Sequence, residues 1–482
     1  MTTAELTTGS APALVLRGAG ARPERVELVG ARARVAATLT GRGKTWTATL
    51  SLSASRWGGP VLPLPSGRYR VHVEPADSVE HPEAPEPLAL AQLGPLRAAL
   101  TGWELEIGPP VDPAYDAGEA QGALERRYAT GRESLEEAVF FESFYGRNAS
   151  CNPLAIDRVL SERLPGLVRY WSVVDLSVDV PEGAIPVVEG SPEWWRARAV
   201  SRLLVVNDWM RRRYVRRPGQ HVVQTWHGTP LKRLALHRPG FDPRRAIAVV
   251  RESLRWNVLL AQNPYAASIL RRAYAFGRRP IWVEGYPRND VLRTGDAAPV
   301  RARLGIREDE RVILYAPTWR DDREQIVDFL DAERLAADTG AVVLVRGHSR
   351  TLLPGRDAEG ARVVDVTGFP DTAQLLLAAD ALVTDYSSVM FDFTVTGKPV
   401  YFFVPDLEDY RGRLRGFYFD LTERAPGPLV RTQEELTRAL AHDSAAYADR
   451  YAAWRRAFNA REDGHAAERV VARILDQGLI GG

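Results

Sequence analysis

The stretch that decides the fold reads Val222-Val223-Gln224-Thr225-Trp226-His227-Gly228-Thr229-Pro230-Leu231. Two β-branched residues lead into a polar turn that holds His227, and Gly228 has no Cβ, so backbone or ligand can approach it closely. Pro230 stands where a following helix would begin. This order places a titratable group at the carboxyl end of a strand, where open α/β sheets bind ligands. The alternative is a strand-end histidine whose ring is satisfied by a backbone carbonyl.

Strands and helices are predicted to alternate on both sides of this stretch. The handedness of crossover connections favours parallel sheets with both faces covered. We therefore predict the α/β class, with two successive units whose polar, histidine-bearing turns meet across a cleft. The first series of strands is predicted at 138–143, 168–174, 202–207, the opening stretch, 258–261 and 281–284, and the second at 311–317, 341–345, 363–366, 381–384 and 400–404.

The N-terminal part has a different rhythm. Residues 11–107 alternate apolar and polar positions between Gly- and Pro-rich turns, which predicts a small antiparallel β-sandwich-like domain. Nothing in it indicates catalysis, so we expect an accessory domain. Residues 1–10 are small and polar and are predicted to be disordered. The two α/β units are predicted at 114–292 and 293–478.

The composition excludes several classes of protein. The chain has 482 residues, 45% of them apolar, enough for about three domains. No run approaches the ~20 apolar residues of a membrane span, and residues 1–20 lack a basic start followed by an apolar core. We expect a cytosolic protein, or one attached to a membrane only from its surface. Cys151 is the only cysteine, which excludes an intramolecular disulfide and a thiolate zinc site.

Positive charge is concentrated in one segment. Residues 196–279 hold 18 Arg and one Lys against three acidic residues, a net charge of +16, so the rest of the chain carries −14. Such a segment attracts polyanions or an anionic membrane. Only three of the 63 basic residues are lysines, so a codon bias toward arginine is an alternative explanation, although it does not account for the missing acidic residues. The predicted patch comprises Arg211, Arg212, Arg213, Arg216 and Arg217.

Three turns of the second unit carry polar chemistry. Residues 316–320 supply a hydroxyl, an aromatic ring and a guanidinium, and residues 346–348 supply a cation and an imidazole. Ser387 and Ser388 stand at a predicted helix start, where free N–H groups bind anions. The alternative is simple N-capping, which Ser often performs. Asp392 lies on the same helix face as Ser388, between two phenylalanines, and is predicted to need a partner.

The absence of several common motifs limits the classes of reaction to consider. The sequence has no G-x-G-x-x-G, Walker, HExxH or Gly-x-Ser-x-Gly motif, which argues against nicotinamide enzymes, P-loop kinases, zincins and α/β-hydrolases. Two histidines and an anion site, without a metal cluster, suit transfer of a phosphate-bearing group with one base for the acceptor proton.

The segment 224–232 resembles the first signature of the CDP-glycerol glycerophosphotransferases of teichoic-acid and capsule synthesis. One departure is Ser349, which stands after His348 where the family usually has Pro. The resemblance covers about 138–472 and leaves the β domain out. Its further motifs are Phe141-Glu142-Ser143-Phe144 with Asn152-Pro153, Gly285-Tyr286-Pro287-Arg288-Asn289-Asp290, Tyr315-Ala316-Pro317-Thr318-Trp319-Arg320, Arg346-Gly347-His348, Thr384-Asp385-Tyr386-Ser387-Ser388-Val389-Met390-Phe391-Asp392-Phe393, Lys398-Pro399-Val400 and Asp463-Gly464-His465-Ala466-Ala467-Glu468-Arg469.

The resemblance implies a glycosyltransferase-B-like fold of two facing Rossmann-like domains, 114–292 for acceptor and membrane and 293–478 for the donor. It implies CDP-glycerol or CDP-ribitol as donor, and a lipid-linked or polyol-phosphate acceptor at the cytoplasmic face of the membrane. Neither a cofactor, a divalent metal nor a nucleic-acid partner is expected. His227 is implied as the base and His348 as a second catalytic residue. The implied donor-binding residues are Arg346, Ser387, Ser388, Pro317, Thr318, Trp319, Asp392 and Arg288.

Two alternatives stay open. An ordinary sugar-nucleotide glycosyltransferase on the same fold would release a nucleoside diphosphate instead of CMP. A non-catalytic binder of anionic polymer would use the arginine segment and the β domain, and would not depend on His227. The sequence does not decide between glycerol and ribitol, or between a primase and a polymerase.

Overall fold

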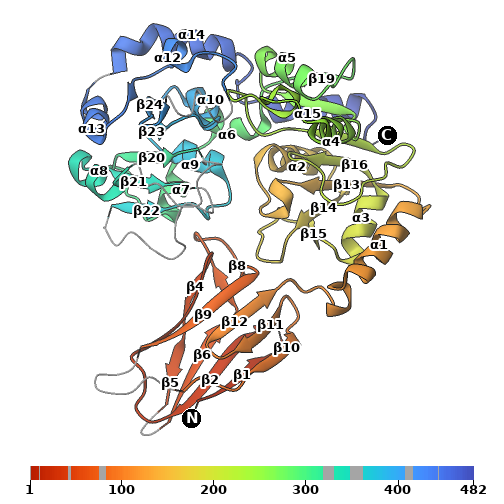
Figure 1. The fold of residues 1–482 in the computed structure, drawn as a ribbon, viewed down its shortest axis with the longest axis vertical. Coiled ribbons are helices and arrows are strands. Elements are labelled where there is room, and N and C mark those ends of the chain that lie inside the picture. The colour runs from red at the N-terminus through yellow and green to blue at the C-terminus, as the bar shows by residue number, and fades with distance from the viewer. Residues whose placement is uncertain are drawn as a thin grey trace.

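The computed structural model describes residues 2–9, 11–41, 45–74, 83–318, 330–347, 362–407, 416–442 and 444–481. An antiparallel β domain lies at the N-terminal end, and two α/β units lie side by side beyond it (Figure 1). Among the helices in these ranges, none combines the length and the apolar character needed to cross a membrane. The chain is therefore an α/β protein with an antiparallel N-terminal part, as predicted.

The β domain pairs two sheets around apolar residues from alternate positions of their strands, such as Leu14, Leu16 and Leu28. The four-stranded sheet has the order β1 (Thr2–Thr7), β2 (Ala13–Ala19), β6 (Thr45–Ser51), β5 (Thr38–Thr40). The six-stranded sheet has the order β10 (Leu88–Gln92), β11 (Arg97–Thr101), β12 (Glu104–Gly108), β9 (Gly67–Glu74), β3 (Arg25–Gly30), β4 (Arg34–Ala36). A small hairpin, β7 (Ser53–Ser55) with β8 (Val61–Pro63), projects from the domain.

The prediction of disorder at residues 1–10 is wrong for β1. This strand pairs along its whole length with β2, and Ala4 and Leu6 pack against the core of the domain. The pairing satisfies the backbone groups of a segment whose short polar side chains gave little sign of burial.

The first α/β unit is built on a seven-stranded parallel sheet. Its order is β15 (Ile185–Val188), β14 (Val168–Val173), β13 (Glu136–Glu142), β16 (Ser201–Val206), β17 (His221–Gln224), β18 (Val258–Ala261), β19 (Ile281–Val283). Its helices are α1 (Gly118–Thr130), α2 (Cys151–Arg163), α3 (Pro192–Val200), α4 (Pro243–Ser253) and α5 (Pro264–Ala273). Ser191, Asp242 and Asn263 cap α3, α4 and α5, each with Pro in the first turn, as helix starts favour.

The second unit has a six-stranded parallel sheet. Its order is β22 (Val363–Asp365), β21 (Val342–Val345), β20 (Val312–Ala316), β23 (Ala381–Thr384), β24 (Val400–Phe403), β25 (Leu429–Val430). Its helices are α6 (Val291–Thr294), α7 (Ala298–Arg303), α8 (Ala332–Thr339), α9 (Thr372–Ala378), α10 (Val389–Phe393), α12 (Leu421–Arg424), α13 (Gln433–Ala441) and α14 (Ala448–Phe458).

The last helix, α15 (Ala466–Asp476), returns to the first unit. Its Val470, Val471 and Ile474 are buried in the same cluster as Val139 and Phe141 of β13. This last helix of the predicted second unit, 293–478, therefore packs its buried apolar face on the first sheet.

Both parallel sheets reverse their strand order at an equivalent place. The reversal lies between β13 and β16 in the first sheet and between β20 and β23 in the second. Parallel α/β sheets bind ligands beyond the carboxyl ends of the strands at such a switch point. The chain thus carries two candidate binding edges.

Candidate functional site

A cavity of about 680 Å³ lies at the junction of the two units. Most of its wall comes from the turn after β17, and two of its residues come from the turn after β23. Its lining residues are Tyr145, Asp208, Trp209, Trp226, His227, Gly228, Thr229, Pro230, Leu231, Lys232, Arg233, Leu234, Arg238, Tyr386 and Ser388. A polar turn of each unit therefore lines the cavity, whereas the predicted meeting of two histidine-bearing turns stays a prediction because His348 lies outside the described residues.

His227 is held in one tautomer. Its Nδ1 lies 2.5 Å from the carbonyl oxygen of Asn207. Because a carbonyl only accepts, Nδ1 carries the hydrogen and Nε2 of the neutral ring is left as the acceptor nitrogen. The two alternatives for this residue are therefore compatible, since the same backbone carbonyl that satisfies the ring also orients it for use as a base.

Unusual backbone surrounds the imidazole. Phe144, Tyr145 and Trp226 have φ values of 45°, 60° and 53°, a left-handed region that bulky residues rarely adopt. The Trp226 indole stacks on His227 with ring centroids 4.8 Å apart, and Phe144 lies 5.6 Å from it at a tilt. Local strain of this kind persists where the surroundings over-determine it, and it is found preferentially at functional sites.

Three residues beside the histidine, Asn207, Tyr145 and Asp208, have no role predicted from the sequence. Asn207 Oδ1 accepts from the backbone N–H of Phe144 at 2.9 Å, which ties the ends of β13 and β16 together at the switch point. The hydroxyl of Tyr145 donates to Asp208 at 2.9 Å, and burial raises the pKa of this tyrosine. The available signal for Asn207 and Asp208 was the pair of polar residues at the end of the apolar run 203–206.

At the second switch point, a hydrogen bond again joins the ends of the two central strands. The backbone N–H of Thr318, just after β20, donates to both carboxylate oxygens of Asp385, just after β23, at 2.8 and 3.0 Å. Lys232 of the first unit donates to the Thr318 hydroxyl at 3.2 Å. The predicted donor residues Pro317 and Thr318 are thus at the carboxyl edge of the second sheet, next to a cation from the first.

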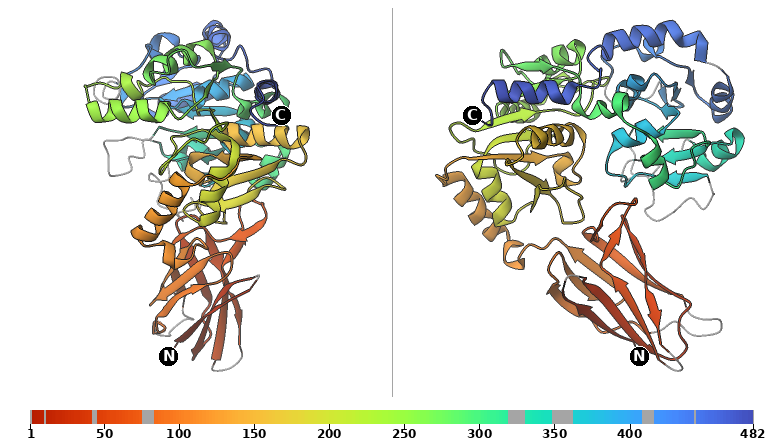
Figure 2. Two further views of the ribbon diagram at one scale, coloured as in Figure 1. Left: turned by 90° about the vertical axis from the view of Figure 1, so that its right-hand side faces the viewer. Right: turned by 180° about the vertical axis from the view of Figure 1, so that it is seen from behind.

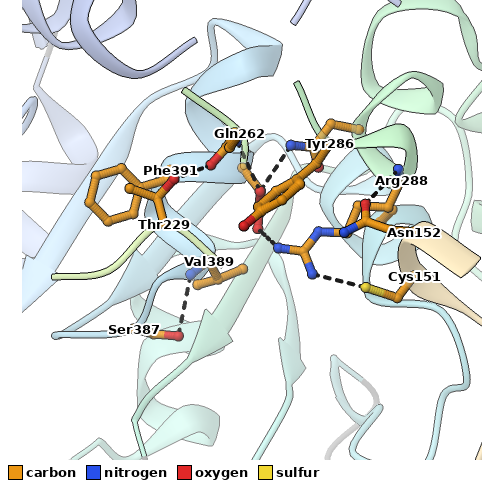
Figure 3. A network of polar contacts seen from close by, with 12 residues as sticks. Cys151, Asn152, Thr229, Gln262, Tyr286, Arg288, Ser387, Val389 and Phe391 are labelled. Atoms are coloured by element: carbon orange, nitrogen blue, oxygen red, sulfur yellow. Dashed lines mark hydrogen bonds and ion pairs between the residues drawn. The ribbon is translucent and has the colours of Figure 1, made fainter. Parts of the chain in front are cut away.

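The two serines have different surroundings. Ser388 lines the cavity with His227, and a Cβ on Gly228 would lie 2.7 Å from its Oγ, so the glycine allows the turns to touch. Ser387 Oγ accepts from the backbone N–H of Val389, the first residue of α10, at 3.5 Å (Figure 3), whereas Ser388 is the N-cap residue and makes no side-chain capping hydrogen bond. Whether either serine holds a phosphate stays a prediction.

Arg346 lies after β21, on the same edge as Thr318. Its Nη1 donates to the carbonyl oxygens of Val366 and Phe369 at 3.1 and 2.9 Å. Burial lowers the pKa of Arg346 to about 10, so the group stays cationic at neutral pH. The predicted site residues His348 and Trp319 lie outside the described residues.

Asp392 and Arg288 form a buried ion pair between the two units (Figure 3). Arg288 Nη2 lies 2.6 Å from Asp392, and Asn289 and Gln262 donate to the same carboxylate at 2.9 and 3.3 Å. Arg288 also donates to the thiol of Cys151 at 3.1 Å. The partner predicted for Asp392 is therefore another side chain of this protein, Arg288. A contact of Asp392 or Arg288 with the donor stays a prediction.

A second buried carboxylate, Glu462, adjoins this pair and was missed by the sequence analysis. It accepts from the backbone N–H of Tyr286 at 3.1 Å and from the Asn289 amide at 3.2 Å. Burial raises its pKa to about 8. No local pattern marks this residue, since its partners lie more than 170 positions away.

Only part of the predicted arginine patch is exposed on the surface of the protein. Arg217 is buried, stacks over Tyr128 and pairs with Glu133, so its assignment to an exposed patch is wrong. Arg211 and Arg212 both pair with Glu189, at 3.7 and 2.9 Å. The acidic partners of these three arginines thus come from outside the segment 196–279. Arg213 and Arg216 are exposed.

Among the described residues, no group of three or more His, Cys, Asp or Glu side chains is placed to hold a metal ion. The site brings together the oriented imidazole of His227 and the hydroxyl of Ser388 at the carboxyl edges of the two parallel sheets. Such an imidazole can take a proton from an alcohol, and such a hydroxyl can donate to an anionic ligand.

The comparisons with known proteins agree with one another. A sequence model of the CDP-Glycerol:Poly(glycerophosphate) glycerophosphotransferase family matches residues 127–476. The chain is 39% identical over 328 residues to the teichoic acid poly(glycerol phosphate) polymerase of Bacillus subtilis (strain 168), and the match covers 63% of this chain and 43% of that protein. It is 35% identical over 376 residues to the teichoic acid glycerol-phosphate transferase of Staphylococcus aureus (strain NCTC 8325 / PS 47), covering 70% and 92%.

Among solved structures, the chain is similar to the wall teichoic acid polymerase TagF. The TM-score is 0.69 at 31% identity, with 74% of this chain and 94% of that one covered. The chain spans less than half of the Bacillus subtilis polymerase but nearly all of the Staphylococcus aureus transferase.

Proposed function

Because the chain belongs to the CDP-glycerol:poly(glycerophosphate) glycerophosphotransferase family, we propose that it transfers glycerol phosphate from CDP-glycerol to a hydroxyl of a polyol-phosphate or lipid-linked acceptor in teichoic-acid synthesis, releasing CMP. The observation that carries this proposal is the cavity in which the oriented imidazole of His227 and the hydroxyl of Ser388 come from different sheets. A related polyol such as ribitol is the alternative donor group.

We propose further that the two parallel sheets are the facing Rossmann-like halves of a glycosyltransferase-B-like fold. Support comes from the equivalent reversals of strand order and from the contacts of Gly228 with Ser388 and of Lys232 with Thr318. In this arrangement the acceptor lies against the first unit and the donor against the second.

The proposed step is an in-line displacement at phosphorus. His227 Nε2 takes the proton of the acceptor hydroxyl while its oxygen bonds to the phosphorus that bears glycerol. The bond from that phosphorus to the bridging oxygen breaks, and CMP leaves with the electron pair. Ser387, Ser388, Arg346 and His348 are proposed to hold the pyrophosphate, with the nucleotide beside Pro317, Thr318 and Trp319. Preorganised donors and charge of this kind are the main source of rate enhancement in phosphoryl transfer.

We also propose that the protein works peripherally at an anionic membrane, on the cytoplasmic face of the cell membrane. Support comes from α4 and the residues that flank it. Phe241 before the helix, Ile247 within it and Leu254 after it have exposed fractions of 91%, 59% and 58%. Exposed Arg244 and Arg251 flank them, and Arg216 donates to the carbonyl oxygen of Leu254 at 3.4 Å. An apolar stripe edged by arginines is typical of helices that lie in the membrane interface.

This surface adjoins the cavity. Leu234 and Arg238, just before Phe241 and α4, line the cavity. Glu252, on the inner side of α4, accepts from the backbone N–H of Met210 at 2.8 Å, next to cavity residue Trp209. An acceptor carried by a lipid therefore has a short route to His227.

The direct test is incubation of the full chain with CDP-glycerol or CDP-ribitol and a glycerol-phosphate oligomer, with products weighed by mass spectrometry. The proposal predicts CMP release and an increment of one or more polyol phosphates on the acceptor. Release of a nucleoside diphosphate from a sugar nucleotide would support the glycosyltransferase alternative. Absence of turnover together with tight binding of the oligomer would support a non-catalytic binder.

A further inference from the structure

The β7–β8 hairpin of the N-terminal domain contacts both α/β units. On the first unit, Arg56 donates to the carbonyl oxygen of Ser177. The backbone N–H of Ser66, just after the hairpin, donates to buried Asp175 at 2.8 Å, and Arg32 lies 3.6 Å from the same carboxylate. The hairpin stands at the end of the β domain that faces both units (Figures 1 and 2).

On the second unit, the contact is made by Trp57 at the hairpin turn. Its ring meets Phe369 edge-on, with centroids 5.6 Å apart. Its carbonyl oxygen accepts from Arg303 at 2.8 Å, and the same guanidinium lies 5.4 Å from the Phe369 ring. Trp57 has a φ of 55°, a left-handed conformation that a bulky residue keeps only when its contacts hold it.

Phe369 connects this contact to the edge of the second sheet. Its ring is buried in the core of the second unit, and its carbonyl oxygen accepts from Arg346 Nη1 at 2.9 Å. Phe369 is thus the single residue between Trp57 and Arg346, whose guanidinium is proposed to face the donor pyrophosphate. The hairpin belongs to a domain outside residues 127–476, the part of the chain that matches the family.

We propose that Trp57 is a positioning residue for donor binding. The hairpin bridges the two units at a place remote from the Gly228–Ser388 contact, and its indole holds the 366–369 turn so that Arg346 keeps its orientation toward the donor. The residue acts through Phe369 and Arg346 and touches no substrate itself. This inference rests on the proposed function for the identity of the ligand, but the bridging contact can be tested without it.

The experiment uses the full chain with Trp57→Ala. We expect the KM for CDP-glycerol to rise about 3- to 10-fold, the range expected for loss of one aromatic pair, with kcat within about twofold of wild type. Hydrogen exchange of the backbone amides at 363–369 should become faster. Trp57→Phe, which keeps a ring against Phe369, should restore most of both properties.

Trp103→Ala is the matched control, because Trp103 is a half-buried indole of the same domain that packs on that domain's own core. It should change neither the KM nor the exchange at 363–369. The double variant Trp57→Ala, Arg346→Lys should bind CDP-glycerol no more weakly than Arg346→Lys alone, since both changes act on the same contact.

Equal KM and exchange in Trp57→Ala and wild type would overturn the proposal, and so would an equal effect of Trp103→Ala. Fully additive losses in the double variant would also overturn it. If wild type releases no CMP, the proposed function fails by itself, while hydrogen exchange at 363–369 still decides whether the hairpin positions the turn.

Discussion

The α-carbon of Gly228 faces Ser388 across the junction of the two parallel sheets, so closely that a Cβ there would lie 2.7 Å from Ser388 Oγ and 3.1 Å from its Cβ. The residue after the proposed base and a hydroxyl proposed to hold the donor are thus in contact. This contact relates the proposed proton-accepting site of one unit to the proposed anion site of the other.

Gly228→Ala should displace the Ser388 hydroxyl. Overpacking of this size lowers the free energy of unfolding by about 1–3 kcal/mol. We also expect the rate of CMP release to fall at temperatures at which the variant is still folded. Ser388→Gly in the same chain should recover part of the stability by removing the clash. Gly118→Ala is the control, because nothing lies within 4 Å of a Cβ at that position; if it behaves like Gly228→Ala, the contact is not the cause.

His227→Ala should lower kcat by the ~10²–10⁴ that a lost general base costs, with donor affinity nearly unchanged. The reason is that Nδ1 is occupied by Asn207 and only Nε2 is left to take a proton. Rates of CMP release and calorimetric titration with CDP-glycerol measure the two properties. His72→Ala, in the exposed face of the β domain, should change neither. Normal turnover by His227→Ala would refute the assignment.

Ser387→Ala with Ser388→Ala should weaken CDP-glycerol binding by about tenfold or more, since hydrogen bonds to a charged group contribute about 1.5–3 kcal/mol. Calorimetry gives the dissociation constant directly. Ser268→Ala, an exposed serine on α5, serves as the control. Unchanged affinity would leave Ser387 with only its contact to the backbone N–H of Val389 at the start of α10.

Glu462→Gln should make stability less dependent on pH. Burial raises the pKa of Glu462 from 4.5 to about 8, so the folded protein keeps this proton over a range in which the unfolded chain has lost it. The stability that depends on the proton is complete below about pH 4.5 and is lost as the pH rises through about 8. Melting temperatures of wild type should therefore fall over this range more steeply than those of Glu462→Gln. Glu104→Gln, an exposed control, should follow wild type; parallel curves for wild type and Glu462→Gln would contradict the prediction.

Binding to anionic vesicles should have an electrostatic component, which salt removes, and a hydrophobic component, which survives high salt. Arg244→Gln with Arg251→Gln should weaken the part that salt removes, at about 1 kcal/mol for each charge near the surface. Phe241→Ser with Leu254→Ser should weaken the part that survives high salt, which an arginine patch alone would not produce. Cosedimentation with anionic and neutral vesicles at low and high salt separates them. Leu90→Ser removes an exposed apolar side chain from the β domain and should have no effect.

Several features of the site were accessible from the sequence because they depend on neighbours along the chain. The strand that ends just before His227 and the hydroxyls after 381–384 follow from hydrophobic runs that end in polar residues. The helix predicted to begin at Pro230 is wrong, because an irregular loop and a 3-10 turn at Ala235–His237 separate β17 from α4, which begins at Pro243. The orientation of His227 by the carbonyl of Asn207 and the burial of Glu462 were not accessible. Any residue has a backbone carbonyl, so the sequence does not mark this contact, and Glu462 owes its proton to burial by partners from distant segments.

The sequence by itself determined the class of each sheet and the turns that carry chemistry, because alternation and strand-end polarity are local properties of the chain. Only the tertiary structure decided which turns meet and which charges remain exposed. The arginines of 196–279 have few acidic neighbours in sequence, yet five of them pair in space with acidic residues from outside the segment, which are Glu133, Glu136, Glu137 and Glu189. Such pairing depends on distance after folding, which separation along the chain does not predict.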